Sequence, residues 1–547
     1  MRYHQQPARE GDGIALPNCG FGTVKSVRIF APGDAFVFAC LTALQIGALG
    51  ALAAYWLLHA SAAPTYILVA VLLGGWLALW ELRWLALPLM ARPVPVAPTP
   101  GLRVAAVTTI VPSKEPLAML ETTVRALVGM RYPHDTWVLD EEGEPAVAAL
   151  CERLGARYFT RTRTAAASEE RGQFAHRTKH GNYNVWLAAI GFERYDILVA
   201  FDLDHVPQSN YLLGTLGYFR DPSVAYVQAA PGFYNQAASL VARGGAEETY
   251  MYWSTTVMAA FGAGYVTVNG SHNVHRISAL EEAGGIADHD GDDVLLTILY
   301  RSNGWRGVYV PEHLALGTSP VTWPSYFRQQ RRWARSLIDI KLRALPSLIG
   351  SLPRSDRPAA ALQGVFFLSG AALPLLFGIG ATWLARGSGP LSLARSWPYL
   401  AASLVAIALC EAFRQRFAID TRERGFHWRA LLVRFAKWPY LVLAFVDAFR
   451  GGHRPYELTE KKPREETEWL APAAHAAAAV LTACAWVVGM QSGGVDDLGL
   501  HVGAALLVAS SLVAAAVIVR SGRTATSAPI VTQRELREHA RAPGAVR

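Results

Sequence analysis

Residues 195–205 read Tyr-Asp-Ile-Leu-Val-Ala-Phe-Asp-Leu-Asp-His. The apolar run at the centre of this stretch is typical of a strand buried inside a sheet, and Asp202 and Asp204 follow it directly. In open sheets of parallel strands, ligands bind just beyond the carboxyl ends of the strands. The stretch therefore predicts a buried strand that brings two carboxylates to a binding site.

Strand and helix signals alternate on both sides of this stretch, and a further aspartate, Asp140, also ends an apolar run. Such alternation is typical of a mostly parallel sheet with helices on both faces, so the predicted fold class of this region is α/β. The expected strands are 104–111, 136–139, 156–160, 195–201 and 224–229, and the expected helices are 116–128, 146–154, 184–190 and 294–300.

Composition places much of the rest of the chain in a membrane. Of the 547 residues, 52% are hydrophobic and only 17% are charged, against about 25% charged residues in a typical soluble domain. These values argue against a disordered chain and against an ordinary cytosolic enzyme. About 20 helical residues cross the hydrocarbon core, so we expect about six membrane helices, two before a polar domain and four after it. The apolar runs are 35–60, 65–90, 362–385, 399–412, 470–490 and 498–519.

The charge distribution predicts which side the polar domain faces. The chain has 51 Lys and Arg against 43 Asp and Glu, a net charge of +8. An even number of spans puts the polar domain and the basic segments at 328–343 and 414–424 on the same side. The positive-inside rule therefore predicts a multi-pass protein of the plasma or inner membrane with a cytosolic polar domain, and no role in binding nucleic acid. The stretch 426–449 is apolar enough for a seventh span, but it combines cations with tryptophans and is expected to lie on, or dip into, the cytoplasmic face.

Asp202 and Asp204 form the sharpest local motif. Two carboxylates at positions i and i+2 after a buried strand can share one divalent cation, and Mg²⁺ is commonly held by one or two carboxylates together with substrate phosphates. The alternative is a turn at a strand end with two solvated aspartates.

A second acidic cluster, Asp-His-Asp-Gly-Asp-Asp at 288–293, opens a predicted helix. Acidic residues near a helix N-terminus are favoured by the helix dipole, which is one sufficient explanation. The functional alternative is a general base, because neighbouring carboxylates raise the proton affinity of each other.

The third motif is Gln-Gln-Arg-Arg-Trp at 329–333. Gln329, Arg332 and Trp333 share one face of a helix, because residues three and four apart are neighbours there. That face offers hydrogen bonds, a fixed cation and an aromatic plane, which suits a leaving diphosphate and a stacked sugar. Arginines near a membrane surface can instead serve lipid headgroups.

Taken in order, these motifs resemble the processive family 2 glycosyltransferases of membranes, the cellulose, hyaluronan and related β-glycan synthases. The resemblance extends from about 105 to 462. It implies a GT-A-like nucleotide-sugar transferase domain, with a mixed, mainly parallel sheet, inserted in an α-helical membrane domain of about six spans. The implied reaction is inverting transfer from a nucleotide sugar.

On the donor side, the resemblance assigns Asp140 to the nucleotide base. Lys179 lies in Lys-His-Gly-Asn-Tyr-Asn, which is similar to a family motif near the nucleotide. Asp202 and Asp204 match the Asp-x-Asp that holds the metal, Mg²⁺ or Mn²⁺, and the diphosphate. Gln329 and Arg332 match the family's Gln-x-x-Arg-Trp on the diphosphate side.

On the acceptor side, Asp293 matches the catalytic base of the family's Thr-Glu-Asp motif. Here the motif is Gly-Asp-Asp, so Asp292 competes for this role. The resemblance implies that Trp333 stacks on the acceptor sugar. His272 and Asn273 lie in the place of the family's acceptor loop, although its usual sequence is absent. The segment 456–461, with Tyr456, Thr459 and Lys461, resembles the family's gating loop.

The resemblance implies an enzyme that polymerises a β-linked polysaccharide from a UDP-sugar, with glucose as the leading donor. Its partners would be the nucleotide sugar, the growing glycan, the lipid bilayer and an accessory export subunit. Two alternatives stay open: a transferase that adds one sugar to a lipid carrier, and a non-catalytic transporter or scaffold.

The expected segments follow the chain in order. They are 1–100 (tail and two membrane helices), 101–320 (catalytic domain), 321–361 (interfacial helices with the Gln-x-x-Arg-Trp motif), 362–425 (two membrane helices), 426–468 (interfacial helix and gating-like loop), 469–519 (two membrane helices) and 520–547 (basic tail).

Overall fold

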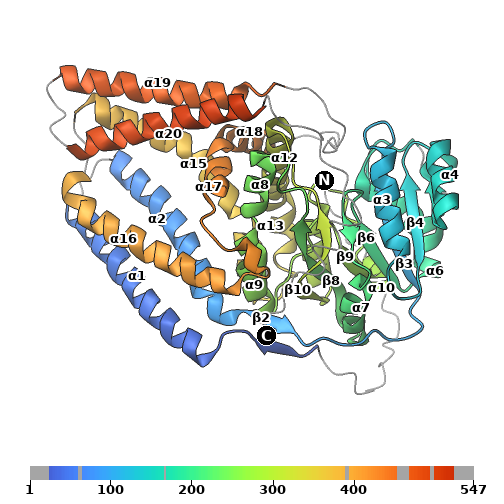
Figure 1. Ribbon diagram of the computed structural model, residues 1–547. Coiled ribbons are helices and arrows are strands. Elements are labelled where there is room, and N and C mark those ends of the chain that lie inside the picture. The colour runs from blue at the N-terminus through green and yellow to red at the C-terminus, as the bar shows by residue number, and fades with distance from the viewer. Residues whose placement is uncertain are drawn as a thin grey trace.

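The computed structural model describes residues 24–59, 64–165, 168–387, 393–451, 467–492 and 498–522. Figure 1 shows an α/β part on the right and a group of long helices on the left, with shorter helices between them. The α/β part comes from the polar middle of the chain, and the long helices come from the apolar segments on either side of it.

The α/β part is built on a sheet of eight strands in the order β5-β4-β3-β6-β9-β8-β10-β7. Most neighbouring strands are parallel, while β9 runs antiparallel to β6 and β8, and β7 runs antiparallel to β10. The predicted mixed, mainly parallel sheet is therefore confirmed. The strands are β3 (Val104–Ile110), β4 (Asp135–Asp140), β5 (Arg157–Thr160), β6 (Ile197–Phe201), β7 (Val206–Pro207), β8 (Val224–Phe233), β9 (Asn273–Arg276) and β10 (Arg306–Gly317).

Helices cover both faces of this sheet. Alternate residues of β3 enter separate cores, Val107 on one face and Ala106 on the other, as the two-residue period of a strand requires. Near the carboxyl end of β3, α3 (Leu117–Val128) and α4 (Pro145–Leu154) pack together over the sheet. The opposite face carries α5 (Lys179–Trp186), α10 (Ile277–Glu282) and α11 (Asp292–Ser302).

Five helices are long and apolar enough to cross a membrane, and a bent pair raises the number to six, among the described residues. This agrees with the expected number of spans. The five helices are α1 (Pro32–Leu58), α2 (Pro64–Leu85), α16 (Leu393–Arg414), α19 (Leu470–Gln491) and α20 (Leu498–Gly522).

The predicted span at 362–385 is not one straight helix. The chain forms α14 (Arg357–Leu362), a short turn at Val365–Phe367 and then α15 (Leu368–Ala385), with a bend of 55° across this region. Gly364 has a φ of +76°, in the left-handed region that favours glycine. The apolar pattern did not show this break, because residues on both sides of it are apolar.

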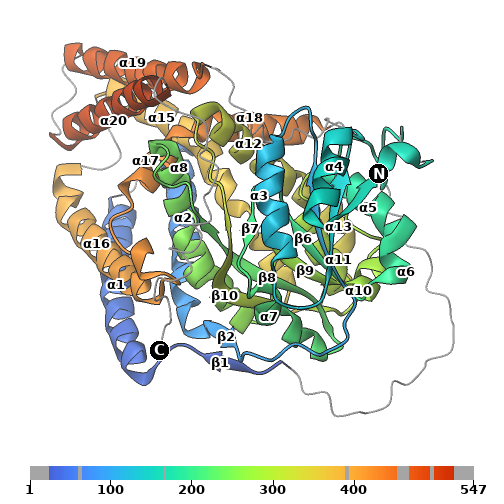
Figure 2. The same ribbon diagram turned by 45° about the vertical axis from the view of Figure 1, so that its right-hand side comes forward.

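Short helices join the two parts of the molecule. They are α8 (Leu240–Glu247), α12 (Trp323–Asp339), α17 (Trp428–Ala436) and α18 (Trp438–Arg450). The ring of Phe327 on α12 stacks on Tyr440 of α18 with centroids 4.7 Å apart. The segment expected as one interfacial helix at 426–449 is thus two helices that meet at Lys437. Figure 2 shows α12 and α18 between the membrane helices and the sheet.

Candidate active site

A cavity of about 1540 Å³ lies beyond the carboxyl ends of the central strands and extends to the membrane helices. Its wall brings together most of the residues that the sequence singled out, although they come from distant parts of the chain. Those that line it are Lys179, Asp202, Asp204, His272, Asp293, Gln329, Arg332 and Trp333. Tyr456, Thr459 and Lys461 of the gating-like loop lie outside the described residues.

Asp202 and Asp204 follow β6 as expected and lie at the edge of the cavity. Asp202, Asp204 and His205 offer ligand atoms that all lie within 4.8 Å of one another. The Thr318 hydroxyl donates a hydrogen bond to Asp204 Oδ2, and His205 Nδ1 lies 3.3 Å from Asp204 Oδ1. Two carboxylates and an imidazole form a donor set that suits Mn²⁺ and accommodates Mg²⁺. The residues present therefore fit the predicted divalent cation, with His205 as a third candidate ligand.

Lys179 begins α5 and points toward the same carboxylates. Its Nζ lies 2.5 Å from Asp202 Oδ1 and donates a second hydrogen bond of 2.8 Å to the Gly270 carbonyl. The Thr178 hydroxyl accepts a hydrogen bond from the Gly181 N–H and so caps this helix, which fixes where its first residue lies. A cation is thus held at the site expected for the diphosphate.

Asp140 ends β4 as predicted, but its carboxylate does not line the cavity. It is fully buried and accepts hydrogen bonds from the Glu142 N–H (2.9 Å), the Glu144 N–H (2.7 Å) and the Tyr158 hydroxyl (3.0 Å). These bonds order the turn that leads into α4. The next residue, Glu141, lines the cavity instead, and burial raises its pKa.

The acidic cluster at 288–293 divides into two groups. Its first three members make polar contacts that link the loop before α11 to other parts of the chain. Asp288 Oδ1 lies 3.1 Å from His180 Nε2, His289 Nε2 lies 3.2 Å from Asp339, and Asp290 pairs with Arg335. Asp292 and Asp293 then form the first turn of α11 and line the cavity.

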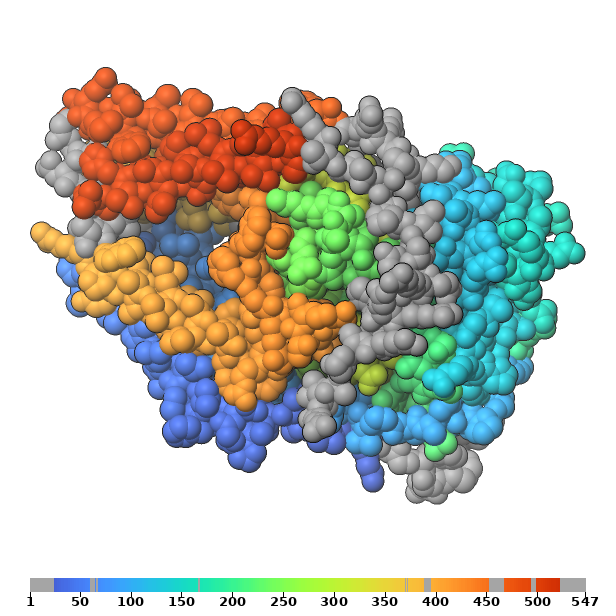
Figure 3. Space-filling view, in the orientation of Figure 1, coloured from blue at the N-terminus to red at the C-terminus, as the bar shows by residue number. Residues whose placement is uncertain are grey.

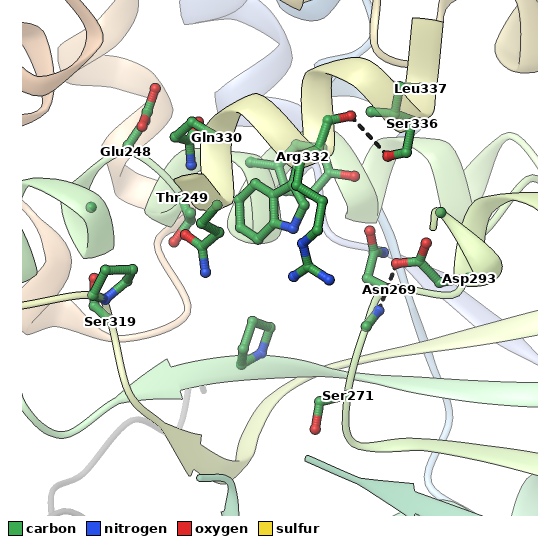
Figure 4. A pocket seen from close by; sticks show the side chains of 18 of the residues that line it. Glu248, Thr249, Asn269, Ser271, Asp293, Ser319, Gln330, Arg332, Ser336 and Leu337 are labelled. Carbon is green, nitrogen blue, oxygen red and sulfur yellow. Dashed lines mark hydrogen bonds between the residues drawn. The ribbon is translucent and has the colours of Figure 1, made fainter. Parts of the chain in front are cut away.

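Asp292 and Asp293 differ in their surroundings. Burial raises the pKa of Asp292 to about 6; the Asp293 carboxylate acts in the same direction, and Lys179 and His180 oppose it. Asp293 Oδ2 accepts a 2.7 Å hydrogen bond from the Gly270 N–H (Figure 4). The two candidates for the general base thus both remain beside the cavity.

The loop expected at the acceptor site divides in a similar way. His272 is buried, adopts a φ of +42°, and its ring lies 4.8 Å from the ring of His205. Asn273 is already inside β9, where its side-chain oxygen is 2.8 Å from His275 Nε2, and it does not line the cavity. The residues of this loop that do face the cavity are Asn269, Gly270, Ser271 and His272.

The residues of the Gln-x-x-Arg-Trp motif lie together on α12. Figure 4 shows the Arg332 guanidinium pointing from this helix into open space, with Ser271 below it and Asn269 and Asp293 to one side. The Trp333 side chain is 40% exposed, which leaves an aromatic surface available on the cavity wall. The helical spacing therefore predicted the shared face correctly.

A buried ionic network behind α12 was not predicted from the sequence. Glu248 accepts hydrogen bonds from Lys437 Nζ (2.5 Å) and the Tyr326 hydroxyl (2.6 Å), and Lys437 Nζ also donates to Gln330 (2.7 Å). The network joins the residue after α8 to α12 and to the junction of α17 and α18. Glu248 and Lys437 are 189 residues apart, so no local pattern connects them.

Residues 105–336 match the protein family described as "Glycosyltransferase like family 2". This part of the chain is a family 2 glycosyltransferase domain. The match begins in β3 and ends in α12, so it includes the Asp-x-Asp residues, Asp293 and the Gln-x-x-Arg-Trp motif.

Related proteins agree with this assignment. Probable glucomannan 4-beta-mannosyltransferase 7 of Oryza sativa subsp. japonica is 28% identical over 244 residues, 41% of this chain and 39% of the relative. The UDP-forming cellulose synthase catalytic subunit of Xanthomonas axonopodis pv. citri is 27% identical over 314 residues, 54% of this chain and 39% of the relative. These matches span about 39% of the length of either relative.

A solved structure has the same fold. The mannosyltransferase PcManGT from Pyrobaculum calidifontis, in complex with GDP-Man and Mn²⁺, superposes with a TM-score of 0.50 at 18% identity and covers 70% of this chain and 97% of that chain. The family 2 glycosyltransferase domain therefore has the GT-A-like fold expected from the resemblance.

Proposed function

We propose that this chain is a membrane-embedded, inverting glycosyltransferase that polymerises a β-linked polysaccharide from a nucleotide sugar. One observation carries the proposal: a single cavity contains the metal-ligand candidates, Asp293 and the Gln-x-x-Arg-Trp face, and continues to residues of the membrane helices such as Leu79 and Val519. A chain extended at Asp293 would therefore meet the membrane helices directly, which supports translocation of the product.

The donor would bind at the carboxyl ends of β4 and β6, with Asp202, Asp204 and His205 holding Mg²⁺ or Mn²⁺. Such a metal ion neutralises the leaving diphosphate. Lys179 and Arg332 would contribute fixed positive charges to the same phosphates. Preorganised cations of this kind are effective in a partly dry cavity, because little reorganisation is needed as charge develops.

The transfer step needs a base on the other side of the sugar. The Asp293 carboxylate would accept the proton of an acceptor hydroxyl while that oxygen attacks the anomeric carbon from the face opposite the diphosphate. The new C–O bond forms as the bond to the diphosphate oxygen breaks, so the configuration inverts. The exposed ring of Trp333 would hold the acceptor sugar by stacking. The neighbouring carboxyl group of Asp292 would influence the electrostatic environment of Asp293.

The donor is inferred from the relatives, and the location is inferred from the charge distribution. The relatives are named as a UDP-forming cellulose synthase subunit and a glucomannan mannosyltransferase, so UDP-glucose is the first donor to test and GDP-mannose the second. The basic residues at the predicted cytoplasmic ends of the spans support a cytosolic active site at the plasma or inner membrane. An accessory export subunit is a further expectation. The family 2 domain argues against a non-catalytic transporter or scaffold.

The test is transfer by the full chain in lipid nanodiscs, with Mg²⁺ or Mn²⁺ and radiolabelled UDP-glucose, GDP-mannose or UDP-N-acetylglucosamine. We expect one donor to give a long, β-linked polymer, sized by gel filtration before and after digestion with a linkage-specific glycosidase. The Asp293→Asn variant in identical nanodiscs is the control for contaminating activity. A product limited to one sugar on lipid would contradict polymerisation, and an α-linked product would contradict inversion for donors linked through an α-diphosphate.

A further inference from the structure

Three cationic side chains surround one aromatic ring at the membrane end of the cavity. Arg83 Cζ of α2, Arg434 Cζ of α17 and Lys437 Nζ lie 5.5, 5.3 and 5.6 Å from the centre of the Phe366 ring. Phe366 lies in the bend between α14 and α15, and all four residues line the cavity. We refer to Arg83, Arg434 and Lys437 as the cationic cluster.

The cationic cluster carries more positive charge than its surroundings balance. Glu248 accepts hydrogen bonds from Lys437 (2.5 Å) and Arg434 (3.3 Å), so one carboxylate serves two cations. Within the parts of the chain that the structure describes, the Arg83 guanidinium contacts the Phe366 ring but forms no ion pair or hydrogen bond. Arg414 and Arg434 act on Arg83 as like charges, and Tyr252 acts in the opposite direction.

Arg83 lies in the last turn of α2, where an arginine side chain can extend toward the membrane interface. Its side chain lines the cavity together with Arg434 and Lys437. Among the described residues, the charge that would balance Arg83 is missing. The cavity itself gives a ligand access to this guanidinium. An oxyanion bound beside Arg83 and Arg434 would supply the missing negative charge, since guanidinium groups bind phosphate through paired N–H donors.

The walls next to the cationic cluster are apolar. The side chains that contribute there include Leu79 and Leu82 of α2, Leu362 at the end of α14, and Ile518 and Val519 of α20. Figure 3 shows a surface hollow bordered by α16, α17 and α20, with α2 visible at its base. These aliphatic walls match a hydrocarbon chain, and the excess of cations matches an anionic group.

We propose that the membrane end of the cavity binds the phosphate group of a lipid. The phosphate lies between Arg83 and Arg434, and the hydrocarbon runs along the aliphatic side chains of α2 and α20. Arg83 and Asp293 line the same cavity, so a lipid phosphate beside Arg83 would share this cavity with the proposed base. Its use as an acceptor rests on the proposed glycosyltransferase function, whereas its binding does not.

Binding is tested with the full chain, stripped of lipid in a neutral detergent and measured by native mass spectrometry. The probes are undecaprenyl monophosphate, dioleoyl phosphatidylglycerol and undecaprenol, which has the hydrocarbon but no phosphate. We expect the phosphate lipids to bind at least about tenfold more tightly than undecaprenol, a difference of about 1.4 kcal/mol. Equal binding of undecaprenol, or binding of a carboxylated oligosaccharide in place of the phosphate lipids, would overturn the proposal.

Variants connect binding to the cationic cluster. Arg83→Gln should weaken phosphate-lipid binding about tenfold or more, and Arg83→Lys, which keeps the charge but not the paired donors, should lose less than Arg83→Gln. Arg416→Gln is the matched control, because Arg416 follows α16, is 57% exposed and pairs with Asp34 outside the cavity lining. Equal loss in Arg83→Gln and Arg416→Gln would show that general headgroup attraction explains binding. Thermal unfolding of each variant checks that it is folded.

Two further measurements complete the test. One shows whether the bound phosphate belongs to an acceptor lipid or to a membrane lipid, and the other tests lipid binding independently of the proposed function. Radiolabel transferred to undecaprenyl monophosphate identifies it as an acceptor, while bound but unlabelled phosphatidylglycerol identifies a membrane-lipid site; both support a phosphate site. Asp293→Asn should lose transfer and keep lipid binding. If the wild type transfers no sugar but binds phosphate lipids through Arg83, the proposed function fails and the lipid site stands.

Discussion

The backbone N–H of Gly270 donates a 2.7 Å hydrogen bond to Asp293 Oδ2, and this bond joins the loop before β9 to the first turn of α11. The Val294 N–H donates to the other carboxylate oxygen at 2.8 Å. Each oxygen still has a free lone pair, because a carboxylate oxygen accepts about two hydrogen bonds. The carboxylate is thus fixed in orientation and can still accept a proton from a ligand in the cavity.

Replacing Asp293 with Asn should remove transfer and leave donor binding intact. The amide keeps the size of the carboxylate but cannot act as a general base, whose contribution is typically about 10²- to 10⁴-fold in rate. Initial rates with radiolabelled donor measure the first effect, and calorimetric titration with the nucleoside diphosphate and Mn²⁺ measures the second. The companion variant Asp292→Asn should keep more activity. If Asp292→Asn were inactive and Asp293→Asn active, the two roles would have to be exchanged.

Asp292 should make stability depend on pH in a particular window. Burial raises its pKa from 3.8 to about 6, so between these values the folded protein binds a proton that the unfolded chain releases. The free energy of unfolding should therefore fall as pH rises from about 4 to about 6, and this part of the fall should be absent in Asp292→Asn. Thermal unfolding of both proteins across this range measures the difference. Glu170→Gln, at an exposed site, should retain the wild-type pH dependence.

The network around Glu248 predicts a large loss of stability from a small substitution. Lys437, Arg434 and the Tyr326 hydroxyl stabilise the ionised carboxylate and keep its pKa below the usual value despite burial. In Glu248→Gln, Lys437 would keep its charge in a buried site without a carboxylate, which typically costs about 3–5 kcal/mol. Chemical unfolding should therefore shift strongly. Adding Lys437→Met should restore part of the loss, and a double variant less stable than Glu248→Gln would show that the pair is not coupled.

The sequence contained enough information for five of the eight strands of the main sheet, but not for β7, β9 and β10. The apolar run of β6 and the spacing of Asp202 and Asp204 are local patterns, and the structure keeps both. Strand β10 was missed because its pattern is interrupted: the register with β8 shifts between Val310 and Ala315, and Pro311 lies in this irregular part. The pairing of β10 with β8 therefore depends on contacts within the sheet, and the alternation of residues along β10 does not reveal it.

Tertiary contacts decide the remaining features. Asp140 was expected to face the nucleotide, but the backbone N–H groups of the turn after β4 and a tyrosine from β5 take up its oxygens. The bend near Gly364 follows from backbone conformation within an apolar segment, where hydropathy gives no signal. The contact between Glu248 and Lys437 joins residues far apart in the chain, so only the folded structure reveals it.

Asp204 should be required for binding a divalent cation. Its carboxylate lies with Asp202 and His205 in the cluster of candidate ligands. Removing a residue that only hydrogen-bonds a metal ligand typically weakens metal binding about 10- to 100-fold. Removing Asp204, a candidate direct ligand, should weaken Mn²⁺ binding by at least as much. Titration of Mn²⁺ followed by electron paramagnetic resonance measures this in Asp204→Asn without any donor. Asp196→Asn is the control, because Asp196 directly precedes β6, the strand that Asp202 and Asp204 follow, and pairs with Arg103 on the surface. Unchanged Mn²⁺ affinity in Asp204→Asn would rule out this site.

Trp333 should affect how long the product grows more than how tightly the donor binds. Its side chain is 40% exposed on the cavity wall, one residue after Arg332, so it can meet a sugar without contributing much to the core. Truncation to Ala removes a large rigid surface, for which a loss of about 1–2 kcal/mol, or about 5- to 30-fold in acceptor affinity, is typical. We therefore expect Trp333→Ala to raise the KM for an oligosaccharide acceptor and to shorten the polymer, while the Kd for the nucleoside diphosphate stays the same.

Trp333→Phe should recover part of the length, because a flat ring remains at the same place. Trp469→Ala removes an exposed tryptophan at the start of α19 outside the cavity lining and should leave product length unchanged. A normal product length in Trp333→Ala would contradict a stacking role, because the acceptor would then not need this ring. An equal shortening in Trp469→Ala would also contradict it, because the shortening would then reflect a general effect at the membrane surface.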